Sequence, residues 1–248
     1  MRVTGVVAAL AAEARALSPT ARVAGPYTAL DDGTLVAVSG IGCAAAGLAA
    51  DRLIDAGATA LVSWGLAGGL DPALRAGAVC MPREVLGADG SCYATAAPWR
   101  EALRASIAAR GAIAPGNLIV PGRLLTALEP VDSVAAKDKA YRETGAAAVD
   151  MESSAIAAAA RVRNLPFIAV RVVVDTASDA VPACVAAASG SGRVRIGRLL
   201  AGLIRSPSEI GPLVRLARRY RAAIRSLEAV ARIAALTRPA GVARSEGT

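Results

Sequence analysis

Four carboxylates follow predicted strands in this sequence and are its main candidates for chemistry: Glu13, Asp150, Glu152 and Asp175. In α/β proteins, ligands bind at the carboxyl ends of the strands, because helices cover both faces of the sheet. Two carboxyl groups whose surroundings differ can act as a general acid and a general base. A carboxylate at the beginning of a helix is also a common capping group, and this interpretation suits Asp150. We therefore expect the four carboxylates to surround one cleft.

Histidine is absent from the chain, and its four cysteines (Cys43, Cys80, Cys92 and Cys184) are widely spaced without a C-x-x-C pair. These features argue against Ser-His and Cys-His nucleophiles and against zinc sites. We expect no metal and no tightly bound cofactor. Scattered cysteines in a chain of this size predict a reduced, cytoplasmic protein.

Two glycine segments each follow a predicted strand. Gly40-Ile41-Gly42 lacks the third glycine of a dinucleotide-binding fingerprint, which argues against an NAD enzyme. The segment Gly65-Leu66-Ala67-Gly68-Gly69 carries three glycines in five residues, so its backbone N–H groups could approach a ligand closely. A tight turn between a strand and a helix is the alternative interpretation of this segment.

The elements that position these residues alternate between strand and helix, which predicts an α/β fold. The apolar pattern predicts strands over 3–9, 34–39, 60–64, 76–86, 117–120, 146–150 and 167–174, and helices over 44–56, 99–110, 133–144 and from Met151 onward. The helix 133–144 is polar and contains the only two lysines, Lys137 and Lys139.

The basic charge of the chain is confined to its end. Residues 1–188 carry 16 Lys and Arg against 17 Asp and Glu, whereas residues 189–248 carry 12 Arg against 3 Glu. We therefore predict a catalytic domain over 1–188 and a basic helical extension over 189–248. Such asymmetry is typical of binding to an anionic surface.

Two basic helices are predicted within this extension, before a disordered segment over 239–248. The second helix, over about 212–236, has a stripe of Leu, Ile, Tyr and Ala opposite six arginines. Two interpretations remain open: a surface helix packed on the domain, or a helix lying on an anionic membrane. No apolar run reaches the ~20 residues needed to span a bilayer. The N-terminus imitates a short signal peptide, but the continuing βα pattern favours a first buried strand.

The segment from Val149 to Asp179 resembles the nucleoside phosphorylase and nucleosidase superfamily, above all the methylthioadenosine/adenosylhomocysteine nucleosidases. The resemblance is carried by Asp150-Met151-Glu152 at the beginning of a helix and by Asp175 at a strand end. Further motifs follow the family order: the first strand with Glu13, then Ser39 to Gly42, then Gly65 to Leu70. Including the tail around Ser206 to Arg219, the chain is most similar to the hopanoid-associated phosphorylase branch.

This resemblance implies a three-layer αβα fold with a central mixed, partly barrel-like sheet, followed by basic amphipathic helices. It implies removal of adenine from an adenosyl lipid, adenosylhopane, with Asp175 as proton donor to purine N7 and Glu13 as the base. Glu152 would hold the ribose hydroxyls and Met151 would pack on the sugar or base. Ile41, Gly65, Ala67 and Gly68 would complete the substrate site. Relatives of this kind form homo-oligomers.

The nucleophile stays open at this point, between water and inorganic phosphate as a co-substrate. Ser63 and Leu66 stand where phosphate-using relatives place Arg and Ser, which disfavours phosphate, whereas the family label favours it. A soluble methylthioadenosine-type nucleosidase is the alternative enzyme, and its Arg-rich tail would then bind no membrane. A nucleic-acid binder is disfavoured because only 3% of the residues are aromatic and could stack on bases. We therefore expect a cytoplasmic enzyme, at the membrane surface if its substrate is a lipid.

Overall fold

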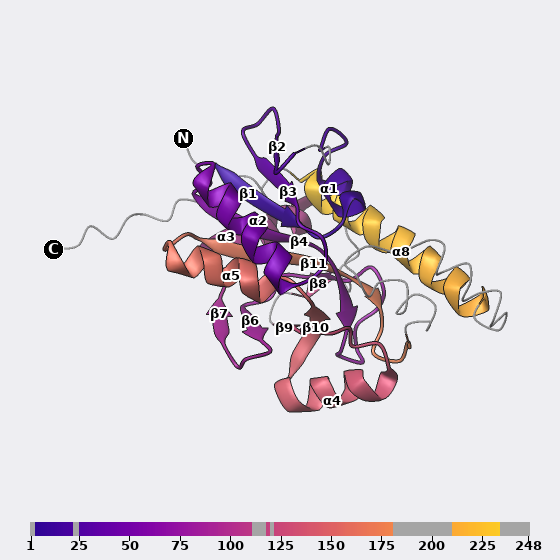
Figure 1. Ribbon diagram of the computed structural model, residues 1–248. Coiled ribbons are helices and arrows are strands. Elements are labelled where there is room, and N and C mark those ends of the chain that lie inside the picture. The colour runs from indigo at the N-terminus through magenta and orange to yellow at the C-terminus, as the bar shows by residue number, and fades with distance from the viewer. Residues whose placement is uncertain (1–2, 22–24, 111–117, 120–121, 181–209, 234–248) are drawn as a thin grey trace.

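The structure is a computed structural model that describes residues 3–21, 25–110, 118–119, 122–180 and 210–233. Cys184, the first of the two predicted basic helices and the segment 239–248 lie outside the described residues. The protein folds as a mixed sheet between helices (Figure 1), which confirms the predicted α/β class.

The strands are β1 (Thr4–Ala8), β2 (Thr28–Ala29), β3 (Leu35–Val38), β4 (Ala60–Gly69), β5 (Val79–Cys80), β6 (Glu84–Gly87), β7 (Cys92–Ala94), β8 (Leu118–Ile119), β9 (Arg123–Thr126), β10 (Ala146–Asp150) and β11 (Phe167–Asp175). The helices are α1 (Ala11–Leu17), α2 (Cys43–Asp55), α3 (Ala97–Arg110), α4 (Val134–Thr144), α5 (Ser153–Val162) and α8 (Ile210–Ala231). Two predictions were wrong: 76–86 is not one strand but contains the separate β5 and β6, and Gly65–Gly69 is not a loop but the second half of β4.

Strand β4 is the centre of the sheet because it is long enough to pair with three others. Its first half pairs in parallel with β1, its last residues pair antiparallel with β10, and β11 runs parallel along its other edge. The glycine segment therefore stays extended between β10 and β11. This pairing brings the ends of β4, β10 and β11 to one place.

Alternating side chains on the strands build two apolar layers. On β4 and β11, one face carries Val62, Trp64 and Val170, which pack with α1, α3 and α8, while Leu61 and Ala169 pack with α2 and α5 on the other face. Buried strands that are apolar on both faces are typical of a sheet covered by helices on both sides. The helical layers leave the strand ends as the open edge.

Helix α8 completes one of these helical layers. Its inner half buries Ala223, Leu227, Val230 and the adjoining Ile233, all at most 4% exposed, in the core beside α1 and β11. The interpretation of a helix packed on the domain is therefore right for this half. The arginines at 215, 218, 221, 225 and 232 point to solvent, so packing and a basic outer face coexist. No described helix is long and apolar enough to cross a membrane.

Candidate active site

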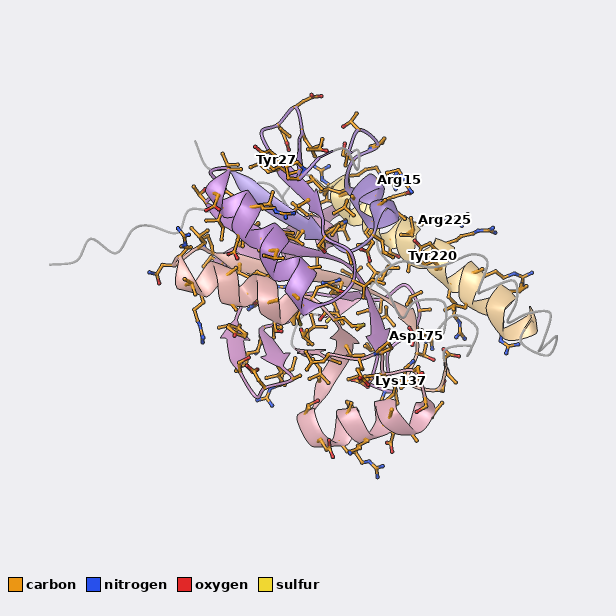
Figure 2. The ribbon with its side chains drawn as sticks, in the orientation of Figure 1. Arg15, Tyr27, Lys137, Asp175, Tyr220 and Arg225 are labelled. Carbon is orange, nitrogen blue, oxygen red and sulfur yellow. The ribbon has the colours of Figure 1, made fainter. Side chains whose placement is uncertain are left out.

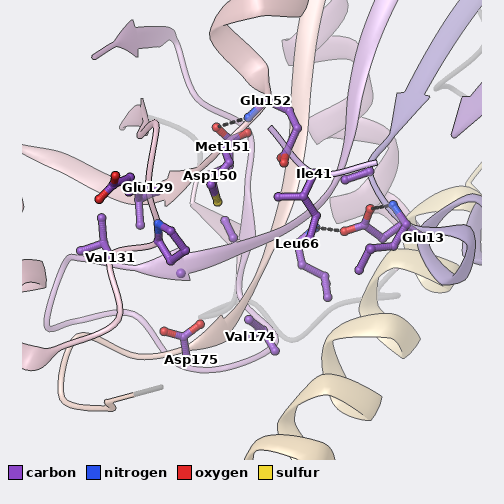
Figure 3. A pocket seen from close by; sticks show the side chains of 16 residues that line it. Glu13, Ile41, Leu66, Glu129, Val131, Asp150, Met151, Glu152, Val174 and Asp175 are labelled. Atoms are coloured by element: carbon purple, nitrogen blue, oxygen red, sulfur yellow. Dashed lines mark hydrogen bonds between the residues drawn. The ribbon is translucent and has the colours of Figure 1, made fainter. Parts of the chain in front are cut away.

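A cavity of about 270 Å³ opens where the ends of β4, β10 and β11 meet. Its lining includes every carboxylate singled out from the sequence (Figure 3). The lining residues are Ala9, Leu10, Glu13, Ile41, Leu66, Ala67, Gly68, Glu129, Pro130, Val131, Val149, Asp150, Met151, Glu152, Val174 and Asp175. The four acids therefore lie around one cavity, as we expected from the sequence.

Glu13 lies on α1, just after β1, and both of its carboxylate oxygens are held by backbone. Oε2 accepts the Leu10 N–H at 2.8 Å, and Oε1 accepts the Leu66 N–H at 2.9 Å. Burial raises the pKa of Glu13, against the opposing charge of Arg171 and these N–H groups. The carboxylate thus has a fixed direction and a raised pKa, which makes it a stronger base.

Gly65 does not line the cavity but allows Glu13 to reach it. A Cβ at position 65 would lie 2.6 Å from Oε1 of Glu13 and 2.8 Å from Nη1 of Arg171. Only glycine therefore leaves room for the carboxylate and the guanidinium to lie against β4 at this residue.

Glu152 precedes the first turn of α5 and faces the cavity beside Met151. Its Oε1 accepts a hydrogen bond from the N–H of Gly42 at 3.0 Å. Gly42 has a φ of 104°, a backbone conformation that residues other than glycine rarely adopt. Burial raises the pKa of Glu152 to about 7, helped by the charge of Asp150 and opposed by Arg171. Its position and its acceptor oxygens suit a pair of hydroxyl groups.

The carboxylate of Asp150 lines the cavity, but its contacts are with other groups of the protein. Thr126 Oγ1 donates to its Oδ1 at 2.8 Å, and the N–H of Ser153 donates to its Oδ2 at 3.2 Å at the beginning of α5. Arg171 Nη2 also contacts Oδ2, at 2.8 Å. The capping interpretation of this residue agrees with these contacts.

Arg171 was not predicted as part of the site, and it lies beneath the cavity floor on β11. Its side chain is 1% exposed and donates to Ser63, Ser153 and the carbonyl of Leu66, besides Asp150 and, at 3.5 Å, Glu152. Burial alone would lower the pKa of Arg171, but the surrounding carboxylates raise it. The guanidinium therefore stays charged and contacts the two acids between the end of β10 and the beginning of α5.

Asp175 ends β11 at a register shift against β4 and faces the cavity beside Gly68. Burial raises the pKa of Asp175, although the charge and hydrogen bond of Lys137 act in the opposite direction. Lys137, from α4, donates directly to Oδ2 of Asp175 (Figure 2). Sequence reasoning treated this lysine as part of a polar helix and missed the contact.

The other predicted site residues lie as follows. Ile41, Ala67, Gly68 and Met151 line the cavity. The lining also includes Glu129, Pro130 and Val131, which precede α4 and which were not singled out from the sequence. Within the described residues, no group of three or more Cys, Asp or Glu side chains is arranged to hold a metal ion.

Solved structures share this fold at low sequence identity. A 5′-methylthioadenosine/S-adenosylhomocysteine nucleosidase from Neisseria meningitidis, in complex with methylthio-immucillin-A, is 19% identical, with a TM-score of 0.68 over 94% of this chain and 98% of that chain. A futalosine hydrolase from Helicobacter pylori is 17% identical, with a TM-score of 0.62 over 82% and 97% of the two chains. A nucleosidase of the first kind from Colwellia psychrerythraea, in complex with adenine, is 21% identical, with a TM-score of 0.61 over 92% and 96%.

No curated protein matches the sequence. A model of the phosphorylase superfamily matches residues 27–205, well over half of the chain and including β4, β10, α5 and β11. The protein therefore belongs to the phosphorylase superfamily of enzymes.

Proposed function

We propose that the protein cleaves the N-glycosidic bond of an adenosine derivative and releases adenine. The observation that carries this proposal is the convergence of Glu13, Glu152 and Asp175 on one cavity of about 270 Å³, with largely apolar walls between them. The solved structures of like fold that hold methylthio-immucillin-A or adenine support the same substrate class.

In the proposed reaction, Asp175 gives its proton to N7 of the purine as the C1′–N9 bond breaks. The bonding electron pair stays with the base, which leaves as neutral adenine, while positive charge develops on the ribose. Burial raises the pKa of Asp175, and this is the direction of shift that a general acid requires. The carboxylate of Glu152 accepts hydrogen bonds from the 2′ and 3′ hydroxyls, and Met151 packs on the sugar.

Water completes the reaction by forming a bond from its oxygen to C1′, and Glu13 takes the proton that it loses. Solvent then returns a proton to Asp175 and accepts one from Glu13, which restores both groups. The fixed direction of Glu13, held by the N–H groups of Leu10 and Leu66, suits a base that addresses a single water.

Charge around the cavity favours water over phosphate as the nucleophile. Five acids are among the described residues that line it (Glu13, Glu129, Asp150, Glu152 and Asp175), and those residues include no Lys or Arg. Arg171, beneath the floor, already donates to side chains and to the Leu66 carbonyl. A phosphate dianion would meet repulsion without a cationic partner, whereas water has no such requirement.

For the substrate, we propose an adenosyl lipid, adenosylhopane, as the resemblance of the tail implies. Helix α8 supports this choice because it passes beside the Glu13 end of the cavity (Figure 3). Burial raises the pKa of Tyr220 on this helix, and the charge of Glu13 adds to that shift. The outer half of α8 exposes Val214 and its arginines, which would suit the surface of an anionic membrane. The alternative is a nucleosidase for methylthioadenosine or adenosylhomocysteine, favoured by the fold of the solved structures.

The decisive experiment measures adenine release from adenosylhopane and from methylthioadenosine, each in phosphate-free and in phosphate buffer. The mass of the sugar product distinguishes a free ribose from a ribose 1-phosphate. We expect a free ribosyl lipid whose yield is independent of phosphate, and incorporation of one ¹⁸O atom from labelled water. Equal turnover of methylthioadenosine would favour the alternative substrate, and no adenine from either would refute the proposed activity.

The membrane part of the proposal has its own test. A variant with Arg215, Arg218, Arg221 and Arg225 changed to Gln removes four exposed charges without touching the buried stripe of α8. We expect wild-type protein to bind phosphatidylglycerol vesicles but not phosphatidylcholine vesicles, and the variant to lose that binding. Its turnover of a water-soluble adenosine derivative should stay at the wild-type level. Equal sedimentation of both proteins with anionic vesicles would contradict the role of the arginines.

A further inference from the structure

Lys137 is the most deeply buried charged side chain next to the cavity, at 0% exposure. Lys139, two residues later on α4, has a side chain that is 71% exposed and lies 3.9 Å from Glu143. Burying an ammonium group is costly unless every one of its donors finds a partner. The burial of Lys137 therefore has to be explained by the groups that accept its hydrogen bonds.

The ammonium of Lys137 has three acceptors, which match its three N–H donors. One is Oδ2 of Asp175, and the others are the carbonyl oxygens of Thr176 and Asp179, each at 2.9 Å. All three belong to the end of β11 and the turn after it. Thr176 closes this turn by donating to the carboxylate of Asp179 through its N–H at 2.9 Å and through its hydroxyl. One lysine thus joins α4 to the whole segment that carries the proposed acid.

The contact with Lys137 distinguishes the two oxygens of Asp175. Because Oδ2 is engaged by the ammonium, a proton on this carboxyl group belongs on Oδ1. Asp175 lines the cavity, and both of its oxygens lie beside Gly68 in that lining. Oδ1 is therefore the oxygen left to address a base bound there.

We propose that Lys137 is a positioning residue, which holds Oδ2 of Asp175 so that Oδ1 presents the transferable proton to the purine. This inference deepens the proposed adenine release and rests on it for its functional meaning. Lys137 does not touch the substrate, and its effect passes through Asp175 and the turn 176–179.

The charge of Lys137 also lowers the pKa of Asp175. Charged groups from three segments face Asp175: Lys137 from α4, Asp179 from the turn and Arg219 from α8, while Glu129 lines the same cavity before α4. Burial raises the pKa of Asp175 and Asp179 adds to this, whereas Lys137 and Arg219 lower it. An acid with too high a pKa would keep its proton as adenine leaves, so a nearby cation makes the proton easier to transfer.

The test measures the titration of Asp175 directly, by ¹³C NMR of the carboxyl carbon in protein without substrate. The signal is assigned by its absence from D175N. We expect K137M to raise the pKa of Asp175 by about 1 to 3 units, the range for losing an opposite charge in contact. K137Q, which keeps a hydrogen-bond donor without the charge, should shift it in the same direction. K139M is the matched control on the same helix and should leave the titration unchanged.

The pH dependence of single-turnover adenine release gives the second readout. Activity falls at high pH as Asp175 loses its proton, so this limb should move to higher pH in K137M by the shift seen in NMR. At neutral pH, kcat should fall at least tenfold while KM changes little, and K137Q should retain more activity than K137M because it still holds Oδ2.

An unchanged titration of Asp175 in K137M and K137Q would overturn the inference. Melting curves confirm that each variant is folded, and K137Q carries the measurement if K137M is not. Absence of adenine release by the wild-type protein would refute the proposed function alone, because the NMR titration still decides whether Lys137 controls Asp175.

Discussion

Two buried cations serve the carboxylates of this cavity in different ways. Arg171 lies under the floor, and its planar guanidinium joins Asp150, Glu152 and the hydroxyls of Ser63 and Ser153. Lys137 lies at the side and places its compact ammonium against one carboxylate and two carbonyls. The guanidinium suits several fixed partners at once, whereas the ammonium acts as a point charge.

The two cations differ because the carboxylates that they contact have different proposed roles. Asp150 accepts an N–H group at the beginning of α5 and Glu152 is proposed to hold the ribose hydroxyls. Neither role involves proton transfer to the substrate, so a cation that never loses its proton can lie beside both. Asp175 is proposed to gain and lose a proton in each cycle. Its cation contacts one oxygen only and leaves the other free to react. The contacts of Arg171 thus mainly stabilise the fold, whereas the contact of Lys137 mainly controls the reactivity of Asp175.

The largest expected effect comes from breaking the arginine cluster. Changing Arg171 to Met leaves buried carboxylates without a counter-charge, which should lower the free energy of unfolding by about 3–5 kcal/mol. Urea denaturation measures this loss. Changing Arg163, whose exposed side chain lies 3.9 Å from Asp55, to Met is the matched control and should cost less than about 1 kcal/mol. Equal stability of the two variants would show that the cluster does not hold the site together.

Changing Asp175 to Asn tests the proposed role of this residue as the proton donor. The amide has nearly the same shape but no transferable acid proton, so kcat should fall by about 100- to 10,000-fold. Single-turnover assays with quantified adenine measure the loss, and melting curves check the fold. Asp138, exposed on α4 and paired with Arg142, gives the control variant D138N, which should retain full activity. Wild-type turnover by D175N would exclude this residue as the acid.

Glu152 contacts Arg171 on one side and lines the cavity on the other, so it connects the arginine cluster with the proposed substrate site. With its pKa raised to about 7 in the free protein, chiefly by burial, the ionised fraction falls as the pH falls below 7. Hydrogen bonds from ribose hydroxyls need that ionised form. We therefore expect kcat/KM to decrease by about tenfold per pH unit below 7. E152Q should lower kcat/KM throughout and leave only the pH dependence that the base Glu13 contributes. A flat profile between pH 5 and 7 would contradict this assignment.

The sequence predicted the parts of the site that depend on local pattern. The apolar run 146–150 coincides with β10. Glu13 and Asp175 reach the cavity because β1 and β11 run parallel to β4, as the pattern predicted, whereas Asp150 and Glu152 reach it because β10 meets the last residues of β4 from the opposite direction. The segment 65–69 was mistaken for a loop because glycines favour turns. Its extended form depends on β10 and β11 taking both edges of β4, which no local pattern reveals.

Both cations escaped prediction because their partners are distant in the sequence. Arg171 looks like a charge interrupting an apolar strand, and its acids lie about twenty residues earlier. Lys137 and Lys139 look alike on a polar helix, although one is buried and the other exposed. One signal was present: Ala140 and Tyr141, three and four residues after Lys137, pack against a small core cluster and mark that face of α4 as inward.

The smallest expected effect concerns Arg219, which connects α8 to the turn held by Lys137. Its ion pair with Asp179 is partly exposed, with side chains 34% and 23% accessible. Partial burial raises the pKa of Asp179, but hydrogen bonds from Arg219 and Thr176 outweigh it and lower that pKa to about 2. The pair therefore stabilises the fold above the ordinary aspartate pKa, and this contribution is lost as the pH falls toward 2.

We expect R219M to lower the free energy of unfolding at pH 7 by less than about 1 kcal/mol, because solvent screens the pair. The pKa of Asp175 should rise, but by less than in K137M, since Arg219 acts on it across the turn rather than by contact. R218M removes an exposed arginine of the same helix and is the control for general charge effects. A shift of the Asp175 titration in R219M as large as that in K137M would mean that the total charge near the turn, rather than contact with Oδ2, adjusts the acid.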